Sequence, residues 1–435
     1  LNESLNKAYE MPVEERYIDT RELKEKINNA ERDLVARTAK YGNIAGSVEL
    51  TWKDVQSAMK NGDVAIEFTK FEVDSAKTQY AALVLTKEMK SPVLVPLCTA
   101  SDLQKLMRTG SLPDKQDDGR GATVLRDKRM GLYTSTDLYT AIWKPMEKYF
   151  GKNARIYFAP AGILHQVAIE YAPVDAKTSI SDKYEMYRIS STRFLATDYS
   201  PRPFEDAVLY GGIKYDSDTA AMKRENERFG SRAVSYNSFA EINKDEDRSS
   251  LNYLPGTKSE VEAIASMMRL GKWNTDLREG EQANEESFKD LSGKKVSLLH
   301  IATHGFFLPT DEKLNSSQSL NLSGLMLAGA NNIWQNRSIP KGIEDGILTA
   351  KEISGMDLRS TDMVVLSACQ TGLGEITDEG VFGLQRGFKK AGVHTIIMSL
   401  WSVDDNATQL MMTEFYSNLI KGMTKREAFL KAQRT

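Results

Sequence analysis

The residue types best suited to nucleophilic and acid–base chemistry are scarce in this chain of 435 residues. They are the two cysteines and four histidines Cys98, Cys369, His165, His300, His304 and His394. His304 closely follows the apolar run Val296–Ala302, and Cys369 follows Met363–Ala368. Both runs are typical of buried parallel strands, whose carboxyl ends gather at one edge of a sheet. If the two strands are neighbours, the imidazole and the thiol face each other across one crevice.

A facing thiol and imidazole make a nucleophilic pair, because the thiolate attacks and the imidazole lowers the thiol pKa and later protonates the leaving group. The backbone N–H groups of Gly305 and Cys369 would then serve as an oxyanion hole. The gap of 65 residues from histidine to cysteine is near the ~50 of one class of cysteine hydrolase. Cys369 could instead be a small core residue, and His304 could simply cap the end of its strand.

The elements that must position this pair alternate along the second half of the chain. Strands are expected at Ala207–Ile213, Thr275–Arg278, Val296–Ala302, Met363–Ala368 and Thr395–Trp401. Helices are expected at Lys258–Leu270, Ala283–Leu291, Val381–Lys390, Ala407–Ile420 and Lys425–Gln433, the first with a Thr257/Glu260 capping box. This alternation predicts an α/β fold with a mostly parallel sheet covered on both faces.

An earlier α/β unit is expected between about residues 50 and 200. Its segments are a helix beginning near Thr51, strands Val64–Phe68, Tyr80–Thr86, Val93–Leu97 and Ala154–Pro160, a helix Asp137–Tyr149 and a loop Gly110–Lys128. Before it, residues 1–43 carry a narrow apolar stripe at helical spacing, Leu23, Ile27, Ala30 and Leu34. We therefore expect three parts: an N-terminal helical lead-in (1–48), an α/β domain (49–203) and a second α/β domain (204–435).

Composition narrows the class of protein. With 41% apolar and 27% charged residues, the chain is an ordinary globular protein. A net charge of −3 argues against direct nucleic-acid binding, since no global positive field attracts a polyanion. Two distant cysteines exclude a disulfide framework, no zinc-ligand spacing is present, and no apolar run is long enough to span a membrane. These features predict a reducing, cytoplasmic protein.

Five ordered motifs resemble the CHAT family of caspase-like proteases. They are Leu254–Glu260 (LPGTKSE), Leu299–Phe307 (LHIATHGFF), Asp345–Ala350 (DGILTA), Leu366–Gly372 (LSACQTG) and Ser399–Asp405 (SLWSVDD). The resemblance covers about residues 205–435. It implies the caspase–haemoglobinase fold of clan CD, a three-layer sandwich related to caspases and separase, with His304 and Cys369 as the catalytic dyad.

The resemblance extends more loosely to the first unit, through Ile156–Val167. It implies that this unit is a degenerate, pseudo-protease-like half without a matching cysteine; a plain scaffold domain is the alternative. His165 is then expected to satisfy a local hydrogen bond and Cys98 to lie in a core. His300 is expected to lie in the core or behind the site, and His394 in a loop or at a strand start.

Specificity residues are expected just past the last strand. In separase-like enzymes this position carries acidic residues that bind a basic side chain, which implies substrate-binding roles for Asp405 and Asp404. Both could equally cap the following helix. Trp401 is expected to form a pocket wall or a core aromatic, and Asp345 to reach the site or shape the turn before Gly346. Ser367 stands where other arginine-specific relatives carry an aspartate.

The resemblance implies a cysteine endopeptidase that cleaves a protein substrate after a basic residue, without metal or organic cofactor. It also implies a TPR-like region upstream or an activating partner complex. A caspase-like scaffold or signalling module with little proteolysis is the alternative, and an acyltransferase or transglutaminase-like enzyme is a third. The start at Leu1 suggests a missing upstream segment. The stop at Thr435, where the family continues into a further strand, suggests truncation or disorder there.

Two segments are predicted as loops. Phe307–Glu344 is polar and would serve as a lid or a partner-docking insertion. Thr371–Gly380 is rich in glycine and acidic residues, and resembles the caspase loop that orders during activation. Its glycines do not meet the GxGxxG pattern of a dinucleotide site.

Overall fold

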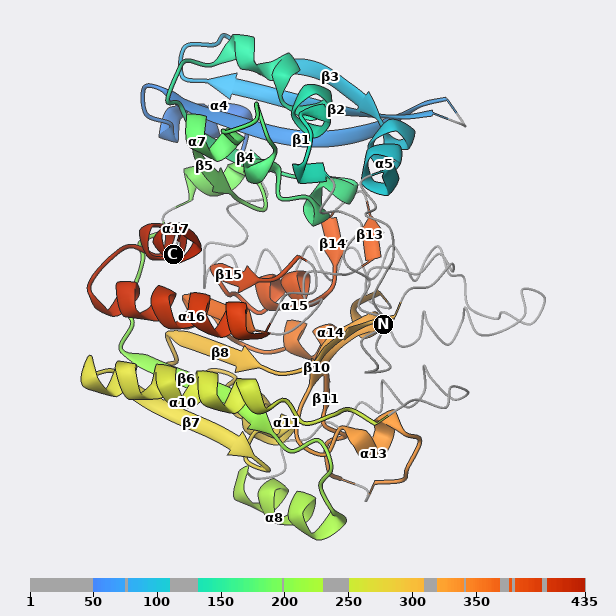
Figure 1. Cartoon of the computed structure of the whole chain (residues 1–435), viewed down its shortest axis with the longest axis vertical. Helices are drawn as coiled ribbons and strands as arrows, with labels where there is room; N and C mark the ends of the chain where they lie inside the picture. Colours follow the sequence, from blue (N-terminus) through green and yellow to red (C-terminus); the bar gives the residue numbers. More distant parts are fainter. Residues whose placement is uncertain are drawn as a thin grey trace, which may run out of the picture.

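The computed structural model describes residues 50–74, 77–109, 132–197, 199–229, 250–308, 319–339, 342–367, 375–377, 380–400 and 405–434. They form two units, each built on a five-stranded sheet, with the first above the second in Figure 1. The first unit comprises the elements from α4 to η6, and the second those from β6 to α17. The helix expected in residues 1–43 and the loop expected at 110–128 lie outside the described residues. The domain boundaries at 48 and 203 stay a prediction.

The sheet of the first unit mixes antiparallel and parallel pairs. Its order is β3-β2-β1-β4-β5, antiparallel from β3 to β1 and parallel from β1 to β5. The strands are β1 (Asp63–Asp74), β2 (Lys77–Thr86), β3 (Val93–Thr99), β4 (Arg155–Ala159) and β5 (Glu185–Arg188). All four predicted strands are confirmed. The unpredicted β5 forms one edge.

Short helices cover this sheet. They are α4 (Trp52–Ala58), α5 (Ala100–Thr109), α6 (Asp137–Ile142), α7 (Ile180–Lys183) and the 3-10 helices η3 (Lys144–Tyr149), η4 (Gly162–Gln166), η5 (Ile169–Tyr171) and η6 (Thr192–Ala196). The predicted helix start at Thr51 is confirmed, with Thr51 and Asp54 capping each other. The single helix predicted at 137–149 is wrong in its second half. Pro145 has no N–H to continue the α-helical ladder, so a 3-10 helix follows α6.

The sheet of the second unit is fully parallel, which confirms the prediction of a mostly parallel sheet. Its order is β15-β12-β8-β6-β7. The strands are β6 (Asp206–Ile213), β7 (Asn274–Gly280), β8 (Leu298–Ala302), β12 (Met363–Ser367) and β15 (Thr395–Met398). Every residue of β8 and β12 is buried, which explains why both read as continuous apolar runs.

Helices cover both faces of this sheet (Figure 1). One face packs against α10 (Pro255–Leu270), α16 (Asp405–Ile420) and α17 (Lys425–Arg434). The other face packs against α11 (Glu285–Lys289), α14 (Ala350–Ser354) and α15 (Leu384–Lys390), while α8 (Thr219–Phe229) lies at the far end. The result is a three-layer α/β sandwich. In the described part of the chain, no helix combines the length and apolarity that crossing a bilayer requires.

The prediction of a loop from Phe307 to Glu344 is wrong for much of that segment. It contributes to a three-stranded antiparallel sheet of β9 (Gly305–Phe307), β10 (Ser323–Met326) and β11 (Ile347–Thr349), with η7 (Leu320–Leu322) before β10 and α13 (Asn331–Trp334) after it. The segment is polar overall, so its composition does not indicate a buried strand. Its apolar contacts come from four buried leucines, Leu320, Leu322, Leu325 and Leu327. Residues 309–318 lie outside the described residues.

The prediction of a loop from Thr371 to Gly380 also needs correction. β13 (Glu375–Thr377) and β14 (Gly380–Phe382) pair antiparallel, so part of this segment is a two-stranded ribbon. Residues 371–374 and 378–379 are not described.

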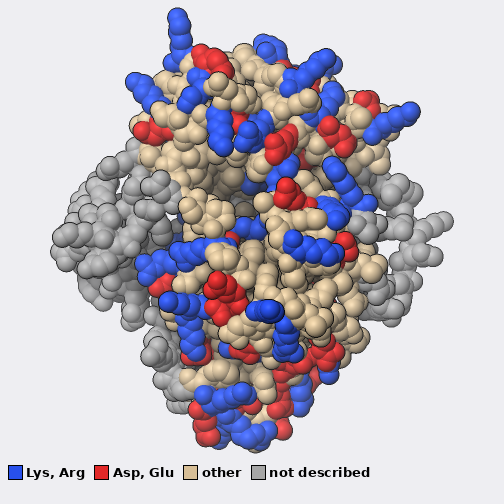
Figure 2. All heavy atoms as spheres, turned by 90° about the vertical axis from the view of Figure 1, so that its left-hand side faces the viewer, with Lys and Arg blue, Asp and Glu red and all other residues tan. Residues whose placement is uncertain are grey.

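Polar contacts join the two units on one side. The Tyr171 hydroxyl in η5 donates to Gln433 Oε1 in α17 at 2.5 Å. Tyr199, in the connection between the units, donates from its hydroxyl to Asp362, directly before β12, at 2.5 Å. Arg426 Nε donates to the carbonyl of Met186 in β5 at 3.2 Å. Figure 2 shows a hollow between the units on this side, with charged side chains around it.

Candidate active site

The strands that lead to His304 and Cys369 are immediate neighbours. β8 and β12 pair in parallel, and Ala302 is in register with Ser367. His304 stands two residues beyond Ala302, and Cys369 two residues beyond Ser367. The predicted adjacency of the two strands is therefore confirmed. Cys369 itself lies outside the described residues.

His304 is half-buried and held by main-chain and aromatic contacts. Its Nε2 lies 2.8 Å from the carbonyl oxygen of Asn252, so Nε2 carries a proton and donates. In the neutral ring the basic lone pair then lies on Nδ1. The ring packs at a tilt on Tyr215, with centroids 5.0 Å apart, and the backbone N–H of His304 donates to the Tyr215 hydroxyl at 3.4 Å.

The Asn252 carbonyl is placed by a buried amide. Asn331, fully buried at the start of α13, accepts from the N–H of Leu251 at 2.8 Å. Its Nδ2 donates to the Ser250 hydroxyl at 2.9 Å and to the Leu251 carbonyl at 3.1 Å. These bonds fix the segment directly before Asn252. Neither asparagine could be identified from the sequence, because neither lies near His304 along the chain.

Tyr215 is fixed from a second direction. Its hydroxyl lies 3.0 Å from Thr303 Oγ1, and Thr303 donates in turn to the carbonyl of Met326. Burial raises the pKa of Tyr215 to about 12, so the phenol stays neutral beside the imidazole. Thr303, the residue directly before His304, is therefore hydrogen-bonded to β10.

Gly305 begins β9, an edge strand of the three-stranded sheet. The carbonyl of His304 accepts from Met326 and the N–H of Leu308 donates to Leu322, so the backbone of alternate residues faces β10. The N–H of Gly305 therefore points away from β10. A donor in this orientation, one residue after His304, suits the oxyanion role predicted for it.

Asp345 is engaged in its own turn. Its Oδ1 accepts from the N–H of Ile347 at 2.8 Å, and Gly346 adopts a positive φ of 80°. Burial and then the charge of Glu352 raise the pKa of Asp345 to about 7. These contacts match the turn-shaping alternative, and its substrate-binding role stays a prediction.

Three carboxylates near this turn lie close enough together to hold a cation. The ammonium group of Lys289 already occupies that place. Carboxylate oxygens of Glu285, Glu344 and Glu352 lie within 4.8 Å of one another. Lys289 Nζ contacts them at 2.7, 2.9 and 2.9 Å. The ammonium neutralises the cluster and joins α11 to α14, which makes this a structural ion cluster.

The other predicted specificity residues lie in or directly after residues 401–404, between β15 and α16. α16 begins at Asp405, seven residues after the last residue of β15. Trp401, Asp404 and the side chain of Asp405 lie outside the described residues. Their roles stay predictions.

The remaining cysteine and histidines fall in structural positions. Cys98 is a free thiol that packs on the first unit's core, and burial raises its pKa to about 11. His300 is fully buried, as expected, and His394 precedes β15 and stacks on Tyr199. Burial and then the charge of Arg188 lower the pKa of His165 to about 4, so this ring is neutral.

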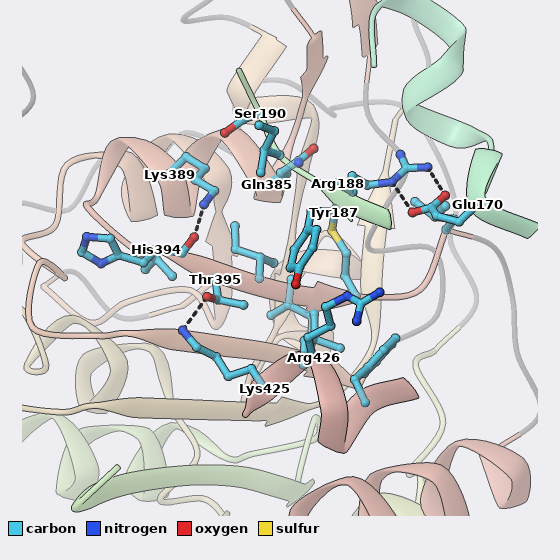
Figure 3. A pocket seen from close by; sticks show the side chains of 18 of the residues that line it. Glu170, Tyr187, Arg188, Ser190, Gln385, Lys389, His394, Thr395, Lys425 and Arg426 are labelled. Carbon is cyan, nitrogen blue, oxygen red and sulfur yellow. Dashed lines mark hydrogen bonds and ion pairs between the residues drawn. The ribbon is translucent and has the colours of Figure 1, made fainter. Parts of the chain in front are cut away.

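A cleft of about 2740 Å³ separates the two units. Its walls include the edge strands β5 and β15, and residues of α15, α16 and α17 complete it. Figure 3 shows Lys389 donating to the His394 carbonyl, Lys425 bonded to Thr395 and Arg188 paired with Glu170. Ser367 also lines the cleft, so the end of the strand that leads to Cys369 borders it.

The sheet order, the helices on both faces and the small antiparallel sheet beside His304 define a caspase-like α/β sandwich. A family model described as CHAT domain matches residues 133–435, well over half of the chain. The chain belongs to the CHAT domain family.

Two curated proteins resemble a shorter stretch. Tetratricopeptide repeat protein 28 of Mus musculus is 37% identical over 78 residues, which is 18% of this chain and 3% of the mouse protein. The human (Homo sapiens) protein of the same name is 30% identical over 92 residues, 21% of this chain and 4% of its own length. This chain thus spans a very small part of either relative.

Among solved structures, the PilB minor pilin from Streptococcus sanguinis aligns over 83% of this chain and 79% of its own, at 9% identity and a TM-score of 0.17. Similarity at that level carries no argument about fold or function.

Proposed function

We propose that this protein is a cysteine endopeptidase in which Cys369 is the nucleophile and His304 the general acid–base. The register of Ala302 with Ser367 on adjacent parallel strands carries the proposal. Each candidate residue follows its strand by the same two residues. The proposal therefore requires only that the two residues after each strand bring the thiol and the imidazole together at one edge of the sheet.

The chemistry follows from the two groups. Nδ1 of His304 takes the thiol proton, and the thiolate of Cys369 forms a bond to the substrate carbonyl carbon. The imidazolium gives its proton to the leaving amine as the carbon–nitrogen bond breaks, which leaves an acyl-enzyme. Water, deprotonated by His304, then releases the acid and the free thiol. The Asn252 carbonyl supports the imidazolium, because it accepts the Nε2 proton throughout.

The tetrahedral oxyanion would be held by backbone donors. We assign these to the N–H groups of Gly305 and Cys369. The N–H of Gly305 points away from β10, which supports its role. One such donor is worth about 10²–10³ in kcat in other acyl-transfer enzymes.

The substrate we propose is a protein segment with a basic residue before the scissile bond. Asp405 and Asp404 would bind the cationic side chain of the substrate beside Trp401. Asp345 would contribute to substrate binding only from its position in the turn before Gly346. The two relatives are named as tetratricopeptide repeat proteins, which supports a repeat region or an activating partner complex working with this domain. A thiol nucleophile suits a reducing cytoplasm.

Incubation of the protein with a fluorogenic panel of Arg and Lys peptides, and with an acyloxymethyl ketone that labels active thiols, tests this proposal. Wild type should cleave and become labelled, and Cys369→Ala should do neither. Failure of both with a candidate activating partner present would favour a scaffold or signalling module. Transfer to added amines, faster than hydrolysis, would instead indicate an acyltransferase.

A further inference from the structure

A chain of buried polar groups lies beneath the candidate site. The Ser367 hydroxyl, at the end of β12, donates to Glu260 Oε2 at 3.0 Å. The other carboxylate oxygen, Oε1, lies 3.1 Å from His300 Nε2. His300 Nδ1 lies 3.0 Å from the Tyr416 hydroxyl. We refer to Ser367, Glu260, His300 and Tyr416 as the buried network.

Glu260 has this role instead of the capping role predicted for it. The capping box is wrong because α10 begins at Pro255, which places Thr257 inside the first turn, bonded to the carbonyl of Leu254. Glu260 therefore lies further along the helix, only 4% exposed, with its carboxylate turned to the sheet.

The surroundings of the network are apolar. Leu298 and Ala302 on β8, Met363 and Val365 on β12 and Phe415 on α16 belong to the same buried layer. A carboxylate and an imidazole are costly in such a layer, and well-packed apolar residues of similar volume are often no less stable. His300 Nε2 and Glu260 Oε1 lie 3.1 Å apart, but the geometry is not that of a hydrogen bond, so neither buried atom has a hydrogen-bond partner among the described residues. Stability alone is thus a weak explanation for these groups.

The positions of the four residues suggest a function. Ser367 ends the strand that leads to Cys369, and His300 lies on the strand that leads to His304. Glu260 lies on α10, the helix that begins three residues after Asn252, whose carbonyl holds His304. The buried network therefore connects the two strands that lead to Cys369 and His304 with the helix that follows Asn252.

We propose that Glu260 is a positioning residue, which fixes the end of β12 against α10 and thereby sets the alignment of Cys369 with His304. This inference rests on the proposed function. Glu260 touches no reacting atom and acts through Ser367. Since a displacement of about 1 Å can cost about 10²-fold in rate, loss of this tether should lower kcat more than it changes KM.

The test is carried out on the 435-residue chain with Cys98→Ala, which leaves Cys369 as the single thiol. Glu260→Gln keeps the shape of the side chain and removes its charge. The matched control is Glu262→Gln on the same helix, whose exposed side chain lies 3.8 Å from Lys258. Measured quantities are kcat and KM on the Arg/Lys panel, the melting temperature and the pH profile of Cys369 alkylation by iodoacetamide.

Glu260→Gln should lower kcat about 10- to 100-fold with KM changed less than about twofold. The midpoint of alkylation should move up toward that of an ordinary thiol, near pH 8.5. Glu262→Gln should leave all values unchanged. Unaltered kcat and alkylation in a folded Glu260→Gln protein would overturn the inference.

Two further variants decide the case if Glu260→Gln fails to fold. Ser367→Ala removes the hydroxyl donor and should lower kcat and shift alkylation in the same direction, while Ser367→Thr, which restores a hydroxyl, should recover both. Equal behaviour of the Ala and Thr variants contradicts the inference. Should wild type lack peptidase activity, the proposed function fails, and the alkylation shift still decides whether Glu260 positions Cys369.

Discussion

The imidazole of His304 donates from Nε2 to the main-chain carbonyl of Asn252 at 2.8 Å. A carbonyl oxygen can only accept, so this contact selects the tautomer whose Nδ1 is basic. It also remains satisfied when the ring becomes an imidazolium. The histidine is thereby oriented by the backbone of a segment 52 residues earlier in the chain.

Asn331→Ala should weaken this orientation. The substitution removes the three side-chain bonds that hold residues 250 and 251, and the N–H of the partly buried Leu251 loses its acceptor. We expect kcat to fall about tenfold and the free energy of unfolding by about 2 kcal/mol. Peptide cleavage and urea titration measure these values. Asn332→Ala, which removes only side-chain contacts on the other side, to the Ser217 carbonyl and Met222, is the control and should keep kcat within about twofold.

Lys289→Met should destabilise the second unit. It leaves three carboxylates together without their shared cation, a loss of about 3–5 kcal/mol. The pKa of Glu285 and that of Glu344 are raised mainly by burial, so mild acid protonates them and should reduce the loss. Unfolding curves at pH 5 and pH 8 provide the comparison. An equal loss at both values would show that the cluster is not electrostatic.

Asp345→Asn should stabilise the protein at alkaline pH. The pKa of Asp345 is about 7 in the fold against 3.8 in a model carboxyl, so its favourable contribution is complete below about pH 4 and is lost as pH rises through 7. Asn keeps an oxygen acceptor for the Ile347 N–H. The stability difference, variant minus wild type, should therefore grow by at least about 1 kcal/mol from pH 4 to pH 8. A flat difference across this range would contradict the assignment.

The two cysteines should differ in reactivity. Because burial raises the pKa of Cys98 to about 11, this thiol is protonated at pH 7.5 and should react slowly with iodoacetamide. If Cys369 forms the proposed dyad with His304, it should be modified at least about tenfold faster. Peptide mass spectrometry of a time course measures both rates in one sample. Faster modification of Cys98 would argue against an activated Cys369.

The sequence supports prediction of the second unit well, because β8 and β12 are buried on both faces and so read as uninterrupted apolar runs. Their adjacency follows from α/β topology, and His304 is located by the end of β8. Asn252 and Asn331 could not be predicted, since each contributes through tertiary contacts that no local pattern records.

The predictions from the sequence were wrong where a local sequence pattern and tertiary packing favoured different structures. Glu260 has the spacing of a cap, but the helix begins earlier and the carboxylate meets Ser367. β10 could not be predicted because its four residues, Ser323–Met326, are too few to show a strand-like alternation of apolar and polar residues. β5 is also four residues long and is recognised only by its pairing with β4.

The most direct measurement of the central claim is the pH profile of Cys369 alkylation in Cys98→Ala protein, with and without His304→Ala. It requires neither substrate nor activator. If the two residues form a dyad, the wild-type midpoint should lie well below 8.5, and His304→Ala should move it to about 8.5 and slow the reaction at pH 7 at least about tenfold. Superimposable profiles would contradict the dyad.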